Sequence, residues 1–128
     1  MTEDSTIIPS LLQMGVLLTL LGIPLMTGKV PRNAGFGVRL PATLSDDRIW
    51  DPVNRSAGRY MVANGLVALG FSIAALLGLF RGSIALMLLL HVLSTLIACV
   101  LSIRQARRLK RALDAQAREK STRAERAL

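Results

Sequence analysis

Residues 61–103 read MVANGLVALGFSIAALLGLFRGSIALMLLLHVLSTLIACVLSI, and this stretch decides the fold. Its two parts, 61–80 and 83–103, each approach the length of about 20 apolar residues that crosses a bilayer as a helix. Neither part contains Asp, Glu, Lys or Arg. Because only Arg81 and Gly82 separate them, the pattern predicts two antiparallel membrane helices joined by a tight hairpin.

A third apolar run, residues 7–27, precedes this hairpin and also carries no charge. The acidic residues Glu3 and Asp4 flank it, whereas a cleaved leader has a basic flank and a shorter apolar core. We therefore expect the run to be a retained membrane helix, with Pro24 ending or kinking it. The sequence predicts an all-α integral membrane protein with three transmembrane helices, 7–27, 61–80 and 83–103.

The composition agrees with a membrane protein and argues against several other classes. The 128 residues are 52% hydrophobic yet carry a formal net charge of +8, and the charges lie in blocks outside the apolar runs. With one cysteine and one histidine, neither a disulfide framework nor a metal site is expected. Cys99 is expected to be a small buried apolar side chain. No acid, Cys or His constellation supports catalysis, so we expect a non-enzymatic protein without cofactor.

Lysine and arginine concentrate in the loop 28–60 and in the segment 104–128. The residues before the first run carry neither, and the hairpin carries only Arg81. Positive charge favours the cytoplasmic side of a membrane. The N-terminus is therefore expected outside and both basic segments in the cytoplasm. The chain is expected to divide into a membrane domain, 1–103, and a basic helical tail, 104–128.

The tail is rich in helix-forming residues and places its apolar groups roughly on one face: Ala106, Leu109, Leu113 and Ala117. Each basic residue near an anionic leaflet contributes about 1 kcal/mol of attraction. The bilayer with its anionic headgroups is thus the first expected partner. Nucleic acid is not expected, because the tail has no aromatic side chain for stacking. A solvated extension that only fixes the topology is the other interpretation.

The loop 28–60 is expected to be structured, because its glycines and prolines predict a shaped turn rather than a helix. Thr43 and Asp46 have the spacing of a capping box for a short helical turn. Asp51 and Pro52 predict the start of a longer helix, as N-cap and first helical residue, that continues into the second span.

One set of loop residues has a definite spacing: Asn33, Gly37-Val38-Arg39, Pro41, Thr43-Leu44, Trp50, Asn54-Arg55 and Gly58-Arg59. This set resembles the signature of the SdpI family of bacterial membrane proteins. The resemblance implies one helix before the loop and a helical hairpin after it, in the bacterial cytoplasmic membrane. It also implies a role in immunity or signalling: binding or neutralising a membrane-active toxin peptide, or holding a regulatory protein at the cytoplasmic face. The ligand- or partner-binding candidates are Asn33, Gly37, Arg39, Pro41, Thr43, Trp50, Asn54, Arg55 and Arg59.

The charges of the loop allow two interpretations. Arg39, Arg55 and Arg59 alternate with acidic residues, and together they form either a binding surface or an internal ion-pair network. Arg39 is the strongest binding candidate, because a backbone shaped by Gly37 and Pro41 aims its guanidinium at a carboxylate or phosphate.

Polar side chains inside the apolar runs raise an alternative function. They are Gln13, Asn64 and His91. Polar groups at that depth face the interior of a bundle and often mark function. A polar seam through all three, in a homo-oligomer, would make a small pore or transporter subunit. The row Gly70, Ala74 and Gly78 predicts a close helix approach, either to the third span or to a second copy.

Overall fold

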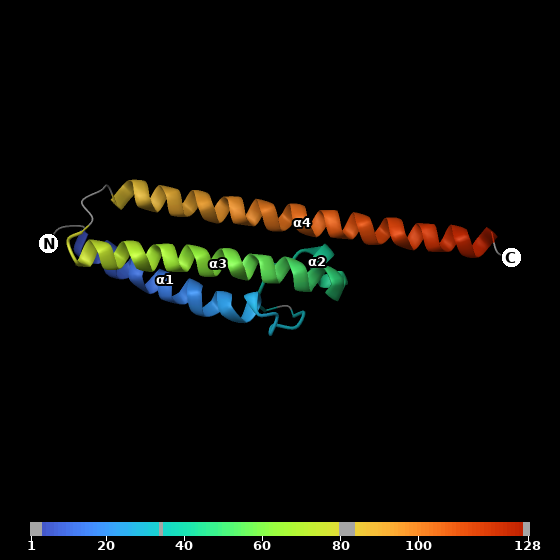
Figure 1. Ribbon diagram of the computed structural model, residues 1–128, viewed down its shortest axis with the longest axis horizontal. Coiled ribbons are helices and arrows are strands. Elements are labelled where there is room, and N and C mark those ends of the chain that lie inside the picture. The colour runs from blue at the N-terminus through green and yellow to red at the C-terminus, as the bar shows by residue number, and fades with distance from the viewer. Residues whose placement is uncertain (1–3, 34, 80–83, 127–128) are drawn as a thin grey trace.

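The computed structural model describes residues 4–33, 35–79 and 84–126. Within them the regular structure is helical: α1 Asp4–Met26, α2 Pro41–Ser45, α3 Asp47–Leu76 and α4 Ile84–Arg126 (Figure 1). α1, α3 and α4 are each long and apolar enough to cross a membrane. This confirms the predicted all-α fold with three candidate membrane helices. The hairpin residues Arg81 and Gly82 lie outside the described residues.

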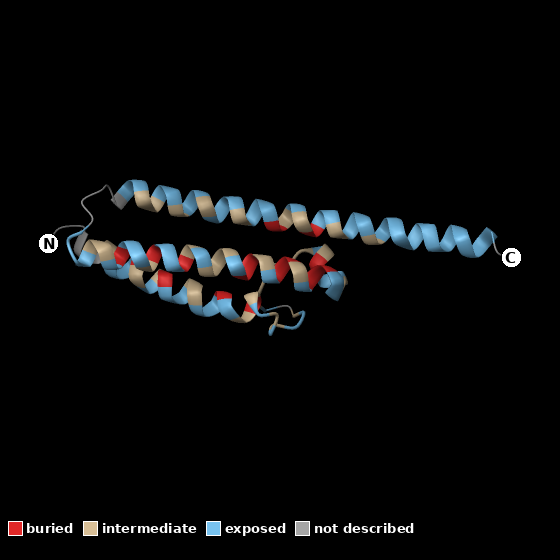
Figure 2. Cartoon of the chain, in the orientation of Figure 1, coloured by how far each residue is buried: buried red, intermediate tan, exposed pale blue. Residues whose placement is uncertain are grey.

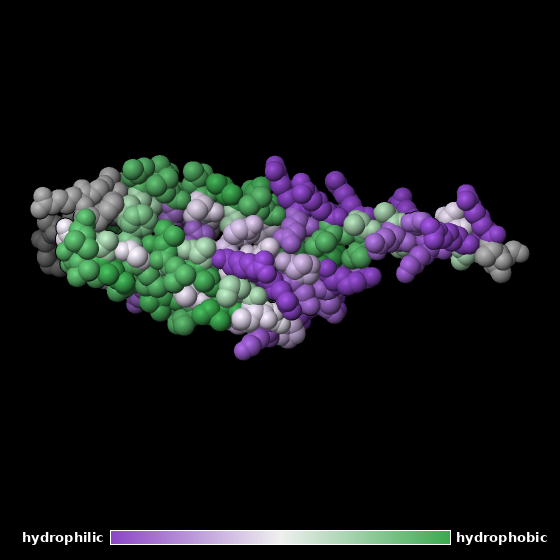
Figure 3. All heavy atoms as spheres, in the orientation of Figure 1, coloured by the Kyte–Doolittle hydropathy of each residue, from purple (hydrophilic) through white to green (hydrophobic). Residues whose placement is uncertain are grey.

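The helices are arranged around α3. α1 packs along one side of α3, and α4 runs along another and continues beyond it as a single long helix (Figure 1). The apolar surface lies at the end of the molecule where the three long helices run together. Polar side chains gather over the loop and along the rest of α4 (Figure 3). This division matches a segment in a bilayer joined to a segment in water.

Glycines set the distance between α1 and α3. Gly15 and Gly22 of α1 face Gly65 and Gly58 of α3, and each pair of positions is seven residues apart. A Cβ on Gly22 would lie 2.9 Å from the carbonyl oxygen of Gly58, and one on Gly15 equally close to that of Gly65. The two backbones are therefore in contact, as in membrane helix pairs with small residues at the interface.

The predicted row of small residues, which includes Gly70 and Gly78, does not form such a close helix contact. A Cβ on Gly70 or on Gly78 would meet nothing within 4 Å, so the expected packing of these glycines on the third span is wrong. Gly78 instead adopts a positive φ of 68° and closes α3. Its N–H donates to Ala75 and the N–H of Leu79 donates to Ala74. This Schellman motif ends the helix at Leu76, earlier than the predicted end of the span.

The start of α3 also differs from the prediction. The helix begins at Asp47, with Asp46 as N-cap, whose carboxylate accepts the N–H of Arg48 at 2.8 Å. The predicted start at Asp51 and Pro52 is wrong, because Asp46 already satisfies a free N–H at the beginning of the helix. Pro52 lies inside α3. The prediction that this helix continues without a break into the second span is confirmed.

The short helix α2 begins earlier than the capping-box pattern suggested. Leu40 is its N-cap and Pro41 its first residue, so Thr43 lies inside the helix. The predicted N-cap role of Thr43 is therefore wrong. Its hydroxyl oxygen accepts the N–H of Leu40 at 2.8 Å. Proline suits the first helical position, because its missing N–H would have no partner there.

Asp46 gives a pH prediction. Hydrogen bonds from the side chain and the backbone of Arg48 lower the pKa of Asp46 from 3.8 to about 2. A depressed folded-state pKa contributes stability above the ordinary value, and this is lost as the pH falls through about 2. We expect the amide resonance of Arg48 to titrate with a midpoint near 2 by NMR, and Asp46→Asn to abolish that titration. A midpoint near 3.8 would mean that the contact does not persist in solution.

A small apolar core lies outside the spans 61–80 and 83–103 that the sequence predicted. Ile49 and Val53 of α3 and Ala106 of α4 form its buried centre. Val38, Leu40, Ala42, Leu109 and Leu113 pack against them. α4 therefore runs straight through the proposed domain boundary after Ile103, and its next turns are fixed against α3. Past Leu113, the described residues of α4 are exposed, Ala117 included (Figure 2).

Candidate functional site

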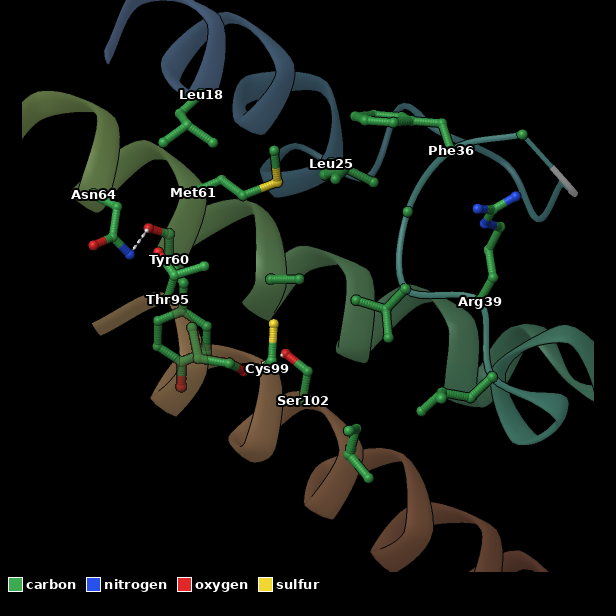
Figure 4. Close-up of a pocket in the computed structure, with 17 residues that line it drawn as sticks. Leu18, Leu25, Phe36, Arg39, Tyr60, Met61, Asn64, Thr95, Cys99 and Ser102 are labelled. Atoms are coloured by element: carbon green, nitrogen blue, oxygen red, sulfur yellow. Dashed lines mark hydrogen bonds between the residues drawn. The ribbon is translucent and has the colours of Figure 1, made fainter. Parts of the chain in front are cut away.

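A cavity of about 540 Å³ lies where the loop meets the three long helices (Figure 4). The loop contributes the backbone and side chains of residues 35–40 as one wall. The helices contribute Leu18, Leu25, Ala57, Tyr60, Met61, Asn64, Thr95, Ala98, Cys99, Ser102 and Ile103. Met61 of α3 points toward Leu25 of α1, and Cys99 and Ser102 point from α4 toward α3 (Figure 4). Most of these side chains are apolar, so the cavity suits an apolar group.

The loop wall is fixed by Asn54, which is only 2% exposed. Its Oδ1 accepts the N–H of Val38 at 2.7 Å, and its Nδ2 donates to the carbonyl of Trp50 at 3.1 Å. The loop passes so close that a Cβ on Gly37 would collide with Oδ1 of Asn54. Gly37 also has a positive φ of 109°, a conformation that side chains disfavour. These two residues therefore set the path of the loop.

The buried side chain of Trp50 holds the loop in place. Its side chain is 0% exposed, and its indole Nε1 donates to the carbonyl of Val30 at 3.0 Å. A Cβ on Gly37 would lie 3.3 Å from its ring. The indole thus contacts the loop at two points, Val30 before the cavity wall and Gly37 within it. Buried indoles of this kind usually satisfy their N–H, as here.

Thr43 and Asn33 complete the scaffold of the loop. The buried hydroxyl of Thr43 donates to the carbonyl of Val38 at 2.7 Å. Oδ1 of Asn33 accepts the N–H of Gly35 at 2.7 Å and that of Phe36 at 2.8 Å. Such side-chain contacts to nearby backbone stabilise turns without regular structure. The candidates Asn33, Gly37, Thr43, Trp50 and Asn54 therefore shape the cavity wall, and Pro41 starts α2 beneath it.

The arginine candidates lie in different places. Arg39 and Arg59 are both exposed, and of the two only Arg39 lines the cavity. Arg55 lies against the end of α1: a Cβ on Gly28 would be 2.5 Å from its Nε. Two acids of the loop form ion pairs, Asp46 with Arg48 and Asp47 with Arg32 at 3.1 Å. Among the signature arginines, Arg39 alone is in the cavity wall.

The polar residues of the apolar runs are brought together only in part. Oδ1 of Asn64 accepts the hydroxyl of Ser94, which links α3 to α4. Both residues line a second cavity of about 270 Å³ together with His91. Gln13 is exposed on α1 and lines neither cavity. Asn64 and His91 therefore line the same cavity, whereas Gln13 is not part of the predicted polar seam.

Sequence reasoning missed several residues of the cavity. Cys99 was expected to be buried, but it is exposed and lines the cavity, so that prediction is wrong. Tyr60 and Ser102 also line it. Their signal is periodicity: they share faces of α3 and α4 with Asn64 and Cys99 at intervals of three or four residues.

The chemical groups at the site are suited to binding a ligand. Arg39 supplies a planar cation that forms paired hydrogen bonds with carboxylates or phosphates. Tyr60, Thr95 and Ser102 supply hydroxyls along an otherwise apolar surface. Among the described residues, no group of three or more His, Cys, Asp or Glu could hold a metal ion. The arrangement fits an amphipathic ligand with an anionic group.

Comparison with known proteins identifies one family. No curated protein and no solved structure matches the chain. Residues 29–102 match the sequence profile of the SdpI/YfhL protein family. This range begins after α1, includes the loop, α2 and α3, and ends within α4. It covers more than half of the 128 residues. The chain therefore belongs to the SdpI/YfhL protein family.

Proposed function

We propose that this protein is a non-enzymatic component of the bacterial cytoplasmic membrane that binds a membrane-active peptide and thereby protects the cell. The ligand lies in the cavity of about 540 Å³, against residues 35–40 of the loop. The observation that carries this proposal is the loop itself, which forms a fixed wall and places Arg39 beside an apolar cavity. The protein spans the membrane with its N-terminus outside and the loop and tail in the cytoplasm.

The size and lining of the cavity support this function. Ligand cavities are usually 300–1,000 Å³ in volume, mostly apolar, with a few polar groups that orient the ligand. A membrane-active peptide has the matching composition, because it combines apolar side chains with a few charged groups. An acidic group of the peptide pairs with Arg39, and the apolar part lies against Leu18, Leu25 and Met61.

The distribution of basic residues supports the orientation. Lys29, Arg32, Arg39, Arg48, Arg55 and Arg59 belong to the loop and the start of α3, at one end of the membrane helices. Arg104, Arg107, Arg108, Lys110 and Arg111 follow on α4 at the same end (Figure 1). Cytoplasmic loops carry this excess of Lys and Arg. The same residues attract the anionic headgroups of that leaflet.

A peptide challenge tests the function. Bacteria lacking the gene would express the intact protein, Arg39→Gln or Arg118→Gln, at levels matched by immunoblot, during exposure to a panel of membrane-active peptides. Arg39 is exposed, and an ion pair between exposed groups contributes about 0.2–1 kcal/mol. We expect Arg39→Gln to lower the tolerated peptide concentration by up to about fivefold.

Arg118→Gln is the matched control, because Arg118 is an exposed residue of α4 beyond the apolar core. We expect it to protect as well as the intact protein. If both variants protect equally, the cavity does not recognise the peptide. If even the intact protein gives no protection against any peptide in the panel, the protective function is wrong. Co-purification would then test the remaining expectation, a regulatory protein held at the cytoplasmic face.

A further inference from the structure

We propose that Arg55 and Arg59 form a binding site for the phosphate of an anionic phospholipid, beside the contact between α1 and α3. Both arginines belong to the loop motif, yet neither lines either cavity. The site is therefore separate from the proposed peptide site, and it requires only that the protein lies in a membrane. The observations behind it are the placement of the two guanidinium groups, their unused donors and the apolar surface beside them.

The guanidinium of Arg55 lies against the end of α1. A Cβ on Gly28 would be 2.5 Å from its Nε and equally close to its Nη2. Gly28 has a positive φ of 70°, its N–H donates to the carbonyl of Leu25, and the N–H of Lys29 donates to that of Pro24. The last carbonyls of a helix carry partial negative charge, which favours a cation beside them. Arg55 is therefore held where the apolar run of α1 ends.

Arg59 lies one helical turn farther along α3, on the same face. Its neighbour Gly58 is at the level of Met26, the last residue of α1, because a Cβ on Gly58 would collide with the backbone nitrogen of Met26. Four residues of a helix cover about 6 Å, and the headgroup region of one leaflet is about 5–8 Å thick. The two guanidinium groups therefore lie at the depth of lipid phosphates.

The donors of both guanidinium groups are available to a ligand. Arg55 and Arg59 are exposed, and within the part of the chain that the structure describes neither side chain forms a hydrogen bond or an ion pair. Two of the three acids near the start of α3 pair with other arginines. The third, Asp51, lies one turn farther from the membrane than Arg55. Because a guanidinium forms paired hydrogen bonds with phosphate, the two arginines can bind one phosphate together.

The surface that continues from Arg59 into the membrane fits the acyl chains of such a lipid. Leu66 and Ile73 follow Arg59 at intervals of seven residues, so they share its face, and they are 55% and 50% exposed. Val62 closes the seam between α3 and α1, since a Cβ on Gly22 would be 2.8 Å from its Cγ2. Acyl chains would therefore lie along the outside of the helix pair, below a phosphate at the arginines.

Position and charge favour a phospholipid over a second copy of the chain. Copies in one membrane share their orientation, so a two-fold contact through this face would place Arg59 against Arg59 at the same depth. Like charges repel, which opposes that contact. Phospholipids touch every exposed helix face in a bilayer, and the arginines need only select among their headgroups. A phospholipid also has its charge at one end and hydrocarbon beyond it, as the two arginines and the leucine and isoleucine below them require.

Lipid retention by the intact protein tests the proposal. The protein would be released from micelles that contain equal amounts of phosphatidylglycerol and phosphatidylcholine, and native mass spectrometry would count the lipids that stay bound. Each basic residue near an anionic surface strengthens attachment up to about fivefold. We expect the wild type to prefer phosphatidylglycerol about tenfold or more, and Arg55→Gln with Arg59→Gln to lower that preference at least about fivefold.

Two paired variants serve as controls. Arg118→Gln with Lys120→Gln removes the same charge from an exposed part of α4 beyond the apolar core, and the preference should not change. Arg55→Lys with Arg59→Lys keeps the charge but loses the planar donors, so its preference should lie between those of the wild type and the glutamine pair. Circular dichroism checks that each variant keeps its helices.

Several results would overturn the site. Equal loss in the glutamine pair and in the α4 control would show that net charge alone attracts the lipid. Equal retention of both lipids by the wild type would refute the site without any variant. Displacement of the lipid by inorganic phosphate would mean that the site takes a soluble anion. If the glutamine pair splits a dimer, or loses protection against the peptide, and keeps its lipid preference, the face belongs to a second copy or to the peptide.

Discussion

Replacing Gly58 with alanine should destabilise the protein by about 1–3 kcal/mol or more, although only one methyl group is added. A Cβ at this position would collide with the backbone nitrogen of Met26 and lie 2.7 Å from the carbonyl oxygen of Gly22. Both atoms belong to the backbone of α1 and cannot turn aside as a side chain would. The methyl group therefore has to separate α1 from α3, which also removes contacts at neighbouring positions.

Gly70→Ala is the matched control on the same helix. A Cβ there meets nothing within 4 Å, and alanine favours a helix over glycine by about 0.5–1 kcal/mol. We expect this variant to be neutral or slightly more stable. Reversible unfolding in mixed micelles, followed by circular dichroism, measures both variants against the wild type. Equal stability of Gly58→Ala and Gly70→Ala would show that the α1–α3 contact is not formed as described.

The contrast between these glycines explains what the sequence could predict of the fold. Uninterrupted apolar runs are a direct consequence of bilayer thickness, so the membrane helices could be found from length and composition. Their contacts could not, because a glycine has the same appearance in the sequence at an interface and at a helix end. Gly70 and Gly78 were assigned to a helix contact, whereas Gly58 and Gly65 make it. The repeat of seven on both helices carried the signal, but only when α1 and α3 are compared as a pair.

The sequence placed the candidate site in the loop. It did not predict which loop residues line the cavity and which support the loop from inside the protein. The loop motif contains Arg39, which lines the cavity, and also Trp50 and Asn54, which are buried beneath it. A polar or aromatic side chain in a loop motif has the same spacing whether it faces a ligand or a backbone carbonyl. The residues of α4 that line the cavity were missed for another reason, because their periodicity shows a shared helix face but not what that face meets. Cys99 and Ser102 reach the loop only through packing of helices far apart in the sequence.

Trp50→Ala should have the largest effect on the loop. Deleting a buried tryptophan side chain costs about 3–5 kcal/mol, and the carbonyl of Val30 loses its hydrogen bond from the indole. The loop wall beside Gly37 also loses the ring that supports it. We expect residues 28–46 to lose protection in hydrogen exchange measured by mass spectrometry, while α1 and the membrane part of α3 keep theirs. Leu44→Ala, at an exposed position of the same loop, should change stability by no more than about 0.5 kcal/mol.

Trp50→Ala and Arg39→Gln together separate support of the site from recognition. Both should weaken protection against the peptide, but for different physical reasons. Trp50→Ala disorders the wall that carries Arg39, so exchange in the loop rises. Arg39→Gln removes the cation from the cavity wall but leaves the buried Trp50 and Asn54 in place, so exchange in the loop should rise much less than in Trp50→Ala. If Trp50→Ala loses loop protection in exchange and still protects cells, the ordered loop is not the recognition element. If Arg39→Gln also disorders the loop, Arg39 supports the fold rather than the ligand.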